Sequence, residues 1–355
     1  FEDVKIDTRR GKEPDLVNII TTVTERPTGS ISVGAGFSST ENLIFNGGVS
    51  QNNFLGRGQR VVFSTNLSSR RTDFNLSLTD PRLFDTEILG GVDAFNRRTN
   101  YYSYKAKTSG AGFRFGKSLS EYDWAGLNYR FNDTEITDVD PTRVTSYLKN
   151  GARVTSRISP TFINDTRDNF LNPSTGSRHV IRFDLAGLGG DKFTRMSYNT
   201  SYYWPIVGKL VGMLHGKISW ADGYGGDQLP IFERYYMGGP KSLRGYTIKN
   251  VGPKDNAGNP LGGNQSLLLN AELQYPFTKG FRGFLFYDRG NVYGVGSTTS
   301  TTSTTWDLAK MRDSIGAGIR FLSPMGPIGF AYGIKLDRAS GEEDGEFHFS
   351  AGSSF

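Results

Sequence analysis

Three ionisable side chains in the second half of the sequence are placed so that they could form a buried ion-pair cluster. Arg244 lies in the segment Leu243-Arg244-Gly245-Tyr246, within a long stretch, 222–265, that is rich in glycine and proline. Glu272 and Asp288 lie in two later segments in which apolar and polar residues alternate. A guanidinium carries five donors in a fixed fork and binds carboxylates through paired hydrogen bonds. The chemistry expected of this set is therefore ion pairing that holds one segment against another.

The sequence offers little for catalysis or metal binding. Cysteine is absent, which excludes disulfides, thiolate nucleophiles and zinc–thiolate sites. The three histidines are His179, His215 and His348. None has a nucleophile partner visible in the sequence, and lone histidines are more often structural. Asp165 and Asp168 begin a turn-like segment that lacks the spacing of a calcium-binding loop. We expect no catalytic residue, no cofactor and no metal site.

The elements that must position these residues are strands. From Thr28 to Phe355 apolar and polar residues alternate in short segments, a period typical of strands with one apolar and one polar face. Strands of about ten residues, repeated and separated by turn signals, are typical of a transmembrane β-barrel. The predicted fold class is therefore all-β: an antiparallel transmembrane β-barrel of about 16 strands, with one long loop at 222–265.

The expected strands and domains can be placed by residue number. Strands are expected at 30–38, 43–51, 58–68, 72–80, 87–96, 104–117, 123–132, 152–162, 177–186, 195–205, 209–221, 266–275, 280–290, 312–321, 328–337 and 346–355. Connections should alternate between short and long. Residues 296–307, mostly Ser and Thr, should form a solvated tip. Residues 29–355 should form the barrel, and residues 1–28 the tail of a small α+β module. The chain starts within a strand pattern at Phe1, so we expect a fragment or a trimmed mature protein.

Composition agrees with a barrel and not with a nucleic-acid-binding protein. The chain has 45 glycines and 13% aromatic residues. Glycine relieves crowding where barrel strands bend, and aromatic residues form girdles at the membrane interfaces. The net charge is +6, but the basic residues are scattered and no recognition helix or RNA-binding signature is present. We expect no nucleic-acid partner.

Strand parity places both carboxylates inside the predicted barrel. In 267–275 the odd positions are apolar, so Glu272 faces the lumen beside Asn270 and Gln274. In 283–288 the apolar Leu285 and Tyr287 share one face, which leaves Asp288 on the other. A buried Arg244 needs such partners. The alternative is that the two acids pair with other lumen charges, such as Arg282 or Lys335.

The long loop resembles that of the Omp85 superfamily, whose sixth extracellular loop folds into the lumen and carries a hydrophobic-Arg-Gly-aromatic motif. Leu243-Arg244-Gly245-Tyr246 matches this motif, with Leu where Val or Ile is commoner, and Glu272 and Asp288 lie at the family's positions for partners of the arginine. The segment 165–169 resembles a recurrent turn of the family. The resemblance implies a loop anchor made of Leu243, Arg244, Gly245, Tyr246, Glu272 and Asp288.

The two ends of the chain resemble those of the outer-membrane assembly factors in this superfamily. Residues 15–38 are similar to the end of the last POTRA domain and the first barrel strand, and 347–355 to an outer-membrane β-signal. The first and last strands must pair to close the barrel, and Gly352-Ser353-Ser354 offers little side-chain packing there. Small residues could instead only relieve crowding; the resemblance favours a gate. The gate residues expected are Ser30, Ile31, Val33, Gly34, Phe37, Phe349, Gly352 and Phe355.

The resemblance implies an insertase in the bacterial outer membrane that folds β-barrel clients through this gate. Its partners would be unfolded outer-membrane proteins, accessory lipoproteins and outer-membrane lipid. A second member of the same superfamily, a secretion transporter, has a similar loop motif, so the motif does not separate the two. An outer-membrane hydrolase is the third hypothesis, and the isolated histidines argue against it.

Overall fold

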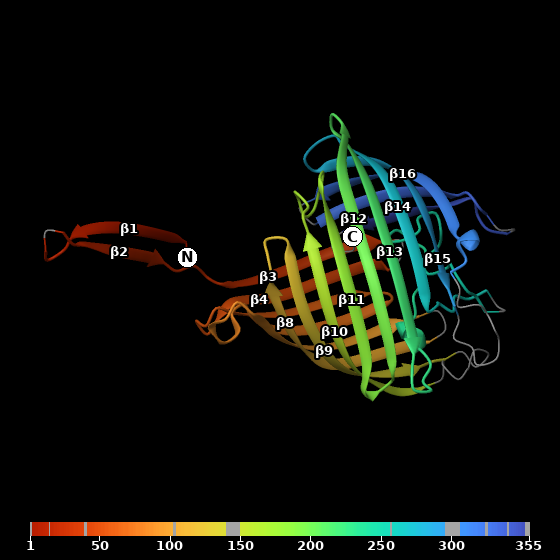
Figure 1. Ribbon diagram of the computed structural model, residues 1–355, viewed down its shortest axis with the longest axis horizontal. Helices are drawn as coiled ribbons and strands as arrows, with labels where there is room; N and C mark the ends of the chain where they lie inside the picture. The colour runs from red at the N-terminus through yellow and green to blue at the C-terminus, as the bar shows by residue number, and fades with distance from the viewer. Residues whose placement is uncertain are drawn as a thin grey trace.

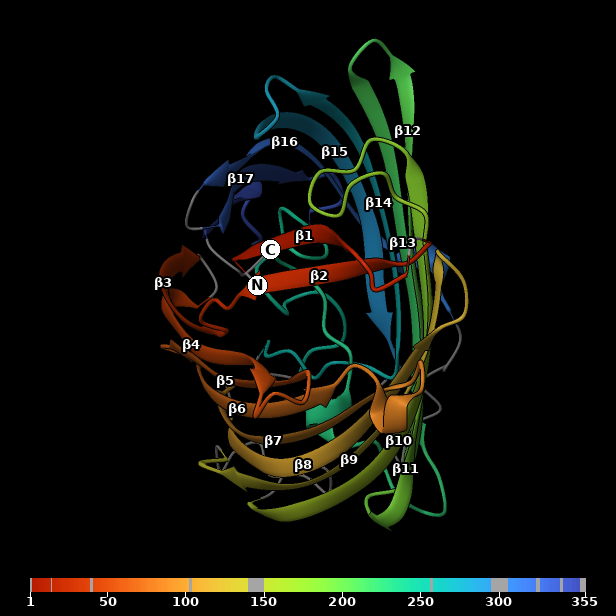
Figure 2. The same ribbon diagram turned by 90° about the vertical axis from the view of Figure 1, so that its left-hand side faces the viewer.

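The computed structural model describes the chain except for residues 1, 14, 39–40, 102–103, 140–149, 256–257, 295–305, 324–325, 339–340 and 352–355. Sixteen strands, β3 to β18, form one closed barrel in which each strand pairs antiparallel with its neighbours (Figures 1 and 2). The predicted fold class and strand number are confirmed. The expected tip at 296–307 lies almost entirely outside the described residues.

The strand bounds agree with the expected segments to within a few residues. The barrel strands are β3 (Gly29–Ser38), β4 (Asn42–Phe54), β5 (Gln59–Ser68), β6 (Arg71–Asp80), β7 (Leu89–Asn100), β8 (Lys105–Ser118), β9 (Asp123–Thr137), β10 (Gly151–Asp165), β11 (Gly176–Gly190), β12 (Phe193–Val207), β13 (Leu210–Gly223), β14 (Gln265–Pro276), β15 (Phe281–Tyr293), β16 (Arg312–Ser323), β17 (Gly326–Lys335) and β18 (Gly345–Ala351). Short 3-10 turns are η1 (Leu83–Asp85), η3 (Ile231–Glu233) and η4 (Leu308–Lys310).

The connections do not alternate cleanly between short and long. We call the end at which β3 begins the hairpin end, and the opposite end the loop end. The loop end carries the long connection 224–264, but it also carries 69–70 and 191–192, which are as short as any turn of the hairpin end. The expectation of regular alternation is therefore wrong for part of the barrel. β5 and β6 stay paired almost to their tips, which leaves little chain for a loop, whereas the last four residues of β11 extend beyond its pairing with β12.

Side chains follow the period of two that the sequence predicts. In β14, Leu269 and Leu273 are exposed on the outer wall, whereas Asn270, Glu272 and Gln274 are buried on the lumen side. The same alternation recurs in β15, where Leu285 is exposed and its neighbours are buried. An outward apolar set and an inward polar set are what a wall between lipid and lumen requires.

The lumen contains the main hydrophobic core, and the long connection supplies most of it. Leu229, Tyr235, Met237, Leu243, Tyr246 and Val251 of residues 224–264 pack with Leu268 of β14 and Val292 of β15. Figure 2 shows this connection inside the ring of strands. We call residues 224–264 the lumen loop.

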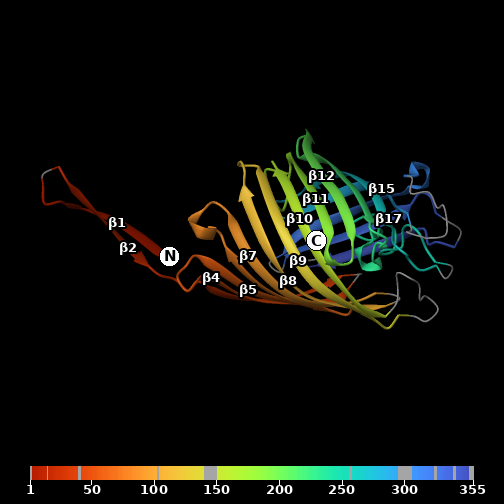
Figure 3. The same ribbon diagram turned by 60° about the horizontal axis from the view of Figure 1, so that its bottom comes forward.

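Residues before the barrel form a separate hairpin, β1 (Asp3–Arg10) with β2 (Val17–Thr24). Nearly all of its residues are exposed, and it projects away from the barrel (Figures 1 and 3). The first barrel strand, β3, begins at Gly29.

Within the described part of the chain, no helix has the length and apolar character needed to cross a membrane.

Candidate functional site

The segment Leu243-Arg244-Gly245-Tyr246 lies in the middle of the lumen loop and is buried against the wall formed by β14 to β18. Leu243 is fully buried, and Arg244 is only 5% exposed. Gly245 has a φ of +84°, a conformation that favours glycine, and a Cβ there would lie 3.0 Å from the backbone of Gly333 in β17. The glycine therefore lets the loop backbone lie directly on the wall.

Arg244 lies between the two carboxylates that strand parity placed in the lumen. Its Nε and Nη2 donate to the two oxygens of Asp288 at 2.7 and 2.6 Å, and its backbone N–H donates to the same carboxylate at 3.1 Å. Its Nη1 donates to Glu272 at 2.5 Å. The guanidinium carbon also lies 3.7 Å from the centre of the Phe286 ring. All these groups are buried, so the ion pairs are shielded from solvent.

A second arginine, Arg320 of β16, completes the cluster. Its Nη2 and Nη1 donate to the two oxygens of Glu272 at 2.8 and 3.1 Å, so Glu272 serves two guanidinium groups and Asp288 only one. Among the described residues, neither Arg282 nor Lys335, the alternative partners, forms an ion pair with Glu272 or Asp288. Strand parity places Arg320 on the same inward face as Ser314, so the sequence already indicated that Arg320 faces the lumen.

The loop motif also contacts the last strand of the barrel. The Gly245 N–H donates to Nε2 of His348 in β18 at 2.9 Å, and His348 is 1% exposed. Its neighbour Tyr246 donates to the carboxylate of Asp337 and lies 3.0 Å from the carbonyl oxygen of Asp313. Burial, followed by the bond to Asp337, raises the pKa of the Tyr246 phenol above its usual range, so it stays a neutral donor. Sequence reasoning gave His348 no role.

A second ion-pair cluster holds the start of the lumen loop on the stretch of wall formed by β10 to β12, with the charges reversed: the loop supplies the acid and the wall the arginines. Glu233, in η3, accepts from Nη1 of Arg157 in β10 at 3.1 Å and also pairs with Arg195 of β12. The Arg195 guanidinium lies 5.0 Å from the centre of the Tyr235 ring. The loop thus brings its own acid to wall arginines, and its own arginine to wall acids. No periodic pattern in the sequence marks Glu233.

The seam between the first and last strands is weakly paired among the described residues. β18 joins β17 from Ile328 with Ala351 through Ile334 with Gly345, but it joins β3 only through Ser350 with Ser38.

Side chains along the β3 edge are more open than those elsewhere on the outer wall. Ile31 and Val33 are 79% and 87% exposed, compared with 47% for Leu269 of the interior strand β14. The Phe37 ring packs across the seam against that of Phe349, with ring centres 5.8 Å apart and the two planes tilted by 31°. The other expected gate residues of β3, Ser30 and Gly34, pair with β4 opposite Ser50 and Asn46. Gly352 and Phe355 lie outside the described residues.

The two other histidines lie among hydroxyl groups, and no carboxylate is hydrogen-bonded to either ring among the described residues. His179 and His215 hydrogen-bond to hydroxyl groups, at 3.0 Å from the Tyr198 oxygen and 3.0 Å from the Ser201 oxygen respectively. No group of three metal-ligating side chains occurs among the described residues. The arrangement can therefore fix a loop against a wall and leave one strand edge weakly paired.

The comparisons with known proteins agree with this geometry. A family model described as the Omp85 superfamily domain matches residues 53–355, and the chain belongs to the Omp85 superfamily. The outer membrane protein assembly factor BamA of Nitratidesulfovibrio vulgaris is 29% identical over 100% of this chain and 45% of its own length. The chain spans about half the length of the curated relatives it matches.

Two solved structures share the fold. The crystal structure of BamA from Haemophilus ducreyi lacking POTRA domains 1-3 matches with a TM-score of 0.88 at 25% identity, over 99% of this chain and 75% of that chain. CdiB from Escherichia coli matches with a TM-score of 0.62 at 15% identity, over 98% of this chain and 66% of that chain. The second likeness concerns the fold alone.

Proposed function

We propose that this protein is an insertase of the bacterial outer membrane, which folds β-barrel clients through a lateral gate between β3 and β18. The observation that carries the proposal is the seam, where the described residues contribute one ladder pair and leave Ile31 and Val33 open at the edge. Relatives named as outer membrane protein assembly factors support the same role and the same location. Residues 1–28 would belong to the last POTRA domain.

The physical basis is that an unpaired strand edge is a template for another strand. In lipid each backbone N–H and C=O without a partner costs several kcal/mol, so an incoming client strand is stabilised by pairing with the β3 edge. The lumen loop would keep β14 to β18 rigid while the seam opens, because its motif contacts each of these strands. No catalytic step, cofactor or metal is part of this proposal. Unfolded clients, accessory lipoproteins and outer-membrane lipid are the implied partners.

A disulfide across the seam tests the proposal. Ser38→Cys with Ser350→Cys would join the one residue pair between β3 and β18. Ser30→Cys with Ser50→Cys is the matched control, because it joins β3 to β4, which stay paired whether or not the seam opens. Both variants are reconstituted in proteoliposomes, and insertion of a urea-denatured client barrel is measured as protease-resistant folded product.

We expect the oxidised seam variant to lose client insertion and to regain it after reduction, while the control variant inserts clients in both states. Insertion that proceeds undiminished through the oxidised seam would refute the gate. A secretion transporter would instead pass unfolded protein through its lumen and would give a large, steady conductance in a planar bilayer.

A further inference from the structure

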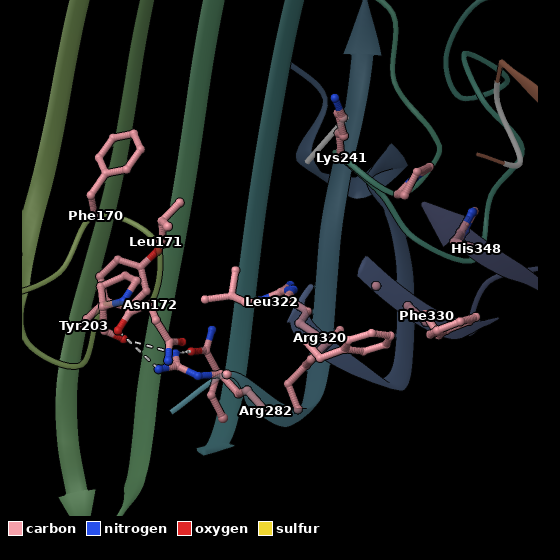
Figure 4. Close-up of a pocket in the computed structure, with 18 of the residues that line it drawn as sticks. Phe170, Leu171, Asn172, Tyr203, Lys241, Arg282, Arg320, Leu322, Phe330 and His348 are labelled. Atoms are coloured by element: carbon pink, nitrogen blue, oxygen red, sulfur yellow. Dashed lines mark hydrogen bonds between the residues drawn. The ribbon is translucent and has the colours of Figure 1, made fainter. Parts of the chain in front are cut away.

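The hydrogen bond between Gly245 and His348 joins the lumen loop to the last strand of the barrel. His348 lies two positions before Ser350, the residue of β18 that pairs with β3. It also lines a cavity of about 590 Å³ inside the barrel, and Figure 4 shows it on the same side of this cavity as Phe330, away from Arg282. This hydrogen bond therefore ties the loop motif directly to the strand at the seam.

The geometry fixes the protonation state of the His348 ring. A backbone N–H can only donate, so Nε2 of His348, 2.9 Å from the Gly245 nitrogen, must carry a free lone pair. The single N–H of the neutral ring is then at Nδ1, which is buried and has no hydrogen-bond partner among the described residues. A protonated ring would point a second N–H at the Gly245 N–H, and neither of its donors would have an acceptor. The contact therefore requires a neutral ring.

Cations surround the ring on the side of the lumen. Arg244 is adjacent to Gly245 in the loop, and Arg320 of β16 and Lys241 of the loop line the same cavity as His348. The described lining of this cavity contains no carboxylate. A proton on the ring would therefore add a positive charge to a space that already holds several, next to a low-dielectric wall.

The described strands beside His348 supply no acid that would compensate this charge. β17 places Ala331 opposite His348, and its next inward charge, on Lys335, is positive. β3 contains no ionisable residue. Glu346 of β18 shares the inward face, but it forms no hydrogen bond with the ring. The two acids of the Arg244 cluster are already bound to arginines.

We propose that His348 is a proton-sensitive latch between the lumen loop and the last strand. The neutral ring holds the loop motif on β18, and a protonated ring releases it. Release removes a support that lies two residues from the pair joining β18 to β3, so acidification loosens the seam from the lumen side. The latch itself does not require an insertase; only its effect on client insertion rests on the proposed function.

The size of the effect follows from which state takes up the proton. A histidine ring in water is half protonated at about pH 6.5. The docked ring has no acceptor for a second N–H, so the released state takes up the proton and acid favours release. The latch is fully present above about pH 6.5, and below it the released population rises about tenfold for each pH unit. Between about pH 7.5 and 5.0 the rise should be about thirtyfold.

The test is the rate at which a non-specific protease cuts residues 224–264 of the whole chain in detergent micelles, between about pH 7.5 and 5.0. Each rate is divided by that for a denatured reference protein at the same pH, which removes the pH dependence of the protease. His348→Gln is the main variant, because its amide oxygen can accept from the Gly245 N–H and takes up no proton in this range. His215→Gln is the matched control, because His215 is a second histidine on the lumen face, opposite Asn270.

We expect the parent protein and His215→Gln to show a rise of about thirtyfold in cleavage rate, and His348→Gln to show little change. All three should migrate as folded barrels on gels run without boiling. A flat profile in the parent protein, or an equal rise in His348→Gln, would overturn the proposal.

A second measurement leaves His348 in place. The double variant His179→Gln with His215→Gln keeps His348 as its single histidine, and nitrogen-15 NMR distinguishes a proton on Nδ1 from one on Nε2. At about pH 7.5 we expect the Nδ1–H form, as the bond from Gly245 requires. A proton on Nε2 at that pH would overturn the proposal, whatever the stability of His348→Gln.

The outcome is separable from that of the gate experiment. A flat cleavage profile, together with a seam disulfide that still blocks insertion, would remove the latch and leave the gate. A profile that depends on His348, together with insertion through the locked seam, would remove the gate and leave the latch.

Discussion

Replacing Arg244 with alanine should release the lumen loop from the wall without unfolding the barrel. The substitution removes three hydrogen bonds from the guanidinium, two to Asp288 and one to Glu272, and the contact with the Phe286 ring. Asp288 is fully buried, and among the described residues it forms an ion pair with no cation other than Arg244. Glu272 keeps both bonds from Arg320. The cost of the substitution should therefore come mainly from Asp288.

The magnitude follows from leaving a buried charge unpaired. Removing one partner of a buried ion pair typically costs about 3–5 kcal/mol. Asp288 keeps a hydrogen bond from Nδ2 of Asn270 at 2.7 Å, which softens the loss and favours the lower end of that range. A cost of about 3 kcal/mol corresponds to roughly a hundredfold rise in the population of the released loop.

Limited proteolysis with a non-specific protease measures this population, because the loop must leave the lumen to be cut. Cleavage within 224–264 should be roughly a hundredfold faster in Arg244→Ala than in the parent protein. The barrel should still migrate as a folded species on gels run without boiling. Arg338→Ala is the matched control, since Arg338 pairs with Asp344 at the surface and its loss should cost less than about 1 kcal/mol.

A second substitution identifies which carboxylate causes the loss. Asp288→Asn in the Arg244→Ala background neutralises the unpaired charge and should recover about 1–2 kcal/mol, or roughly tenfold slower cleavage. Glu272→Gln in the same background should recover nothing, because it also takes the partner from Arg320. Equal protection of Arg244→Ala and the parent protein, or equal rescue by both second substitutions, would refute this account.

The remaining predictions concern two other contacts of the loop motif. His348→Phe leaves the buried Gly245 N–H without an acceptor and should speed loop cleavage by roughly tenfold or more, whereas His348→Gln should be milder; equal cleavage in the two variants would contradict this. Gly333→Ala places a Cβ 2.5 Å from the Gly245 nitrogen, with rigid backbone on both sides, and should cost about 1–3 kcal/mol in the same assay. Gly34→Ala, whose Cβ meets nothing within 4 Å, should change cleavage little and serves as its control.

The strands could be predicted because the alternation of residues within each strand reflects the lipid on one side and the lumen on the other. A strand between lipid and lumen must alternate, so Leu269 and Leu273 fall on one face and Glu272 on the other without knowledge of any neighbour. The strand ends were harder to place. β9 continues to Thr137, beyond the expected end at 132, and β11 continues to Gly190, beyond 186. Where a strand extends beyond the membrane, lipid no longer requires apolar and polar residues to alternate. The strand continues there because its backbone still pairs with a neighbouring strand.

The site could be predicted only in part. Parity with the family resemblance led to Arg244, Glu272 and Asp288, because each lies in a segment with a recognisable pattern. Strand parity also placed Arg320 and His348 on inward faces. Many residues share such a face, so parity does not indicate which side chain each of them contacts. Glu233 gave no signal, since its role depends on Arg157 and Arg195, which lie in strands far from it in the chain.

The sequence by itself determined the class of fold, the number of strands and the face on which each side chain lies. These follow from the alternation of apolar and polar residues along each strand, which lipid on one side and water on the other require. Only the tertiary structure decided that the lumen loop is held by two clusters of opposite polarity, and that its motif reaches His348 on the last strand. Closing sixteen strands into one ring brings chain segments a hundred residues apart within hydrogen-bonding distance, and no local pattern records which segments meet.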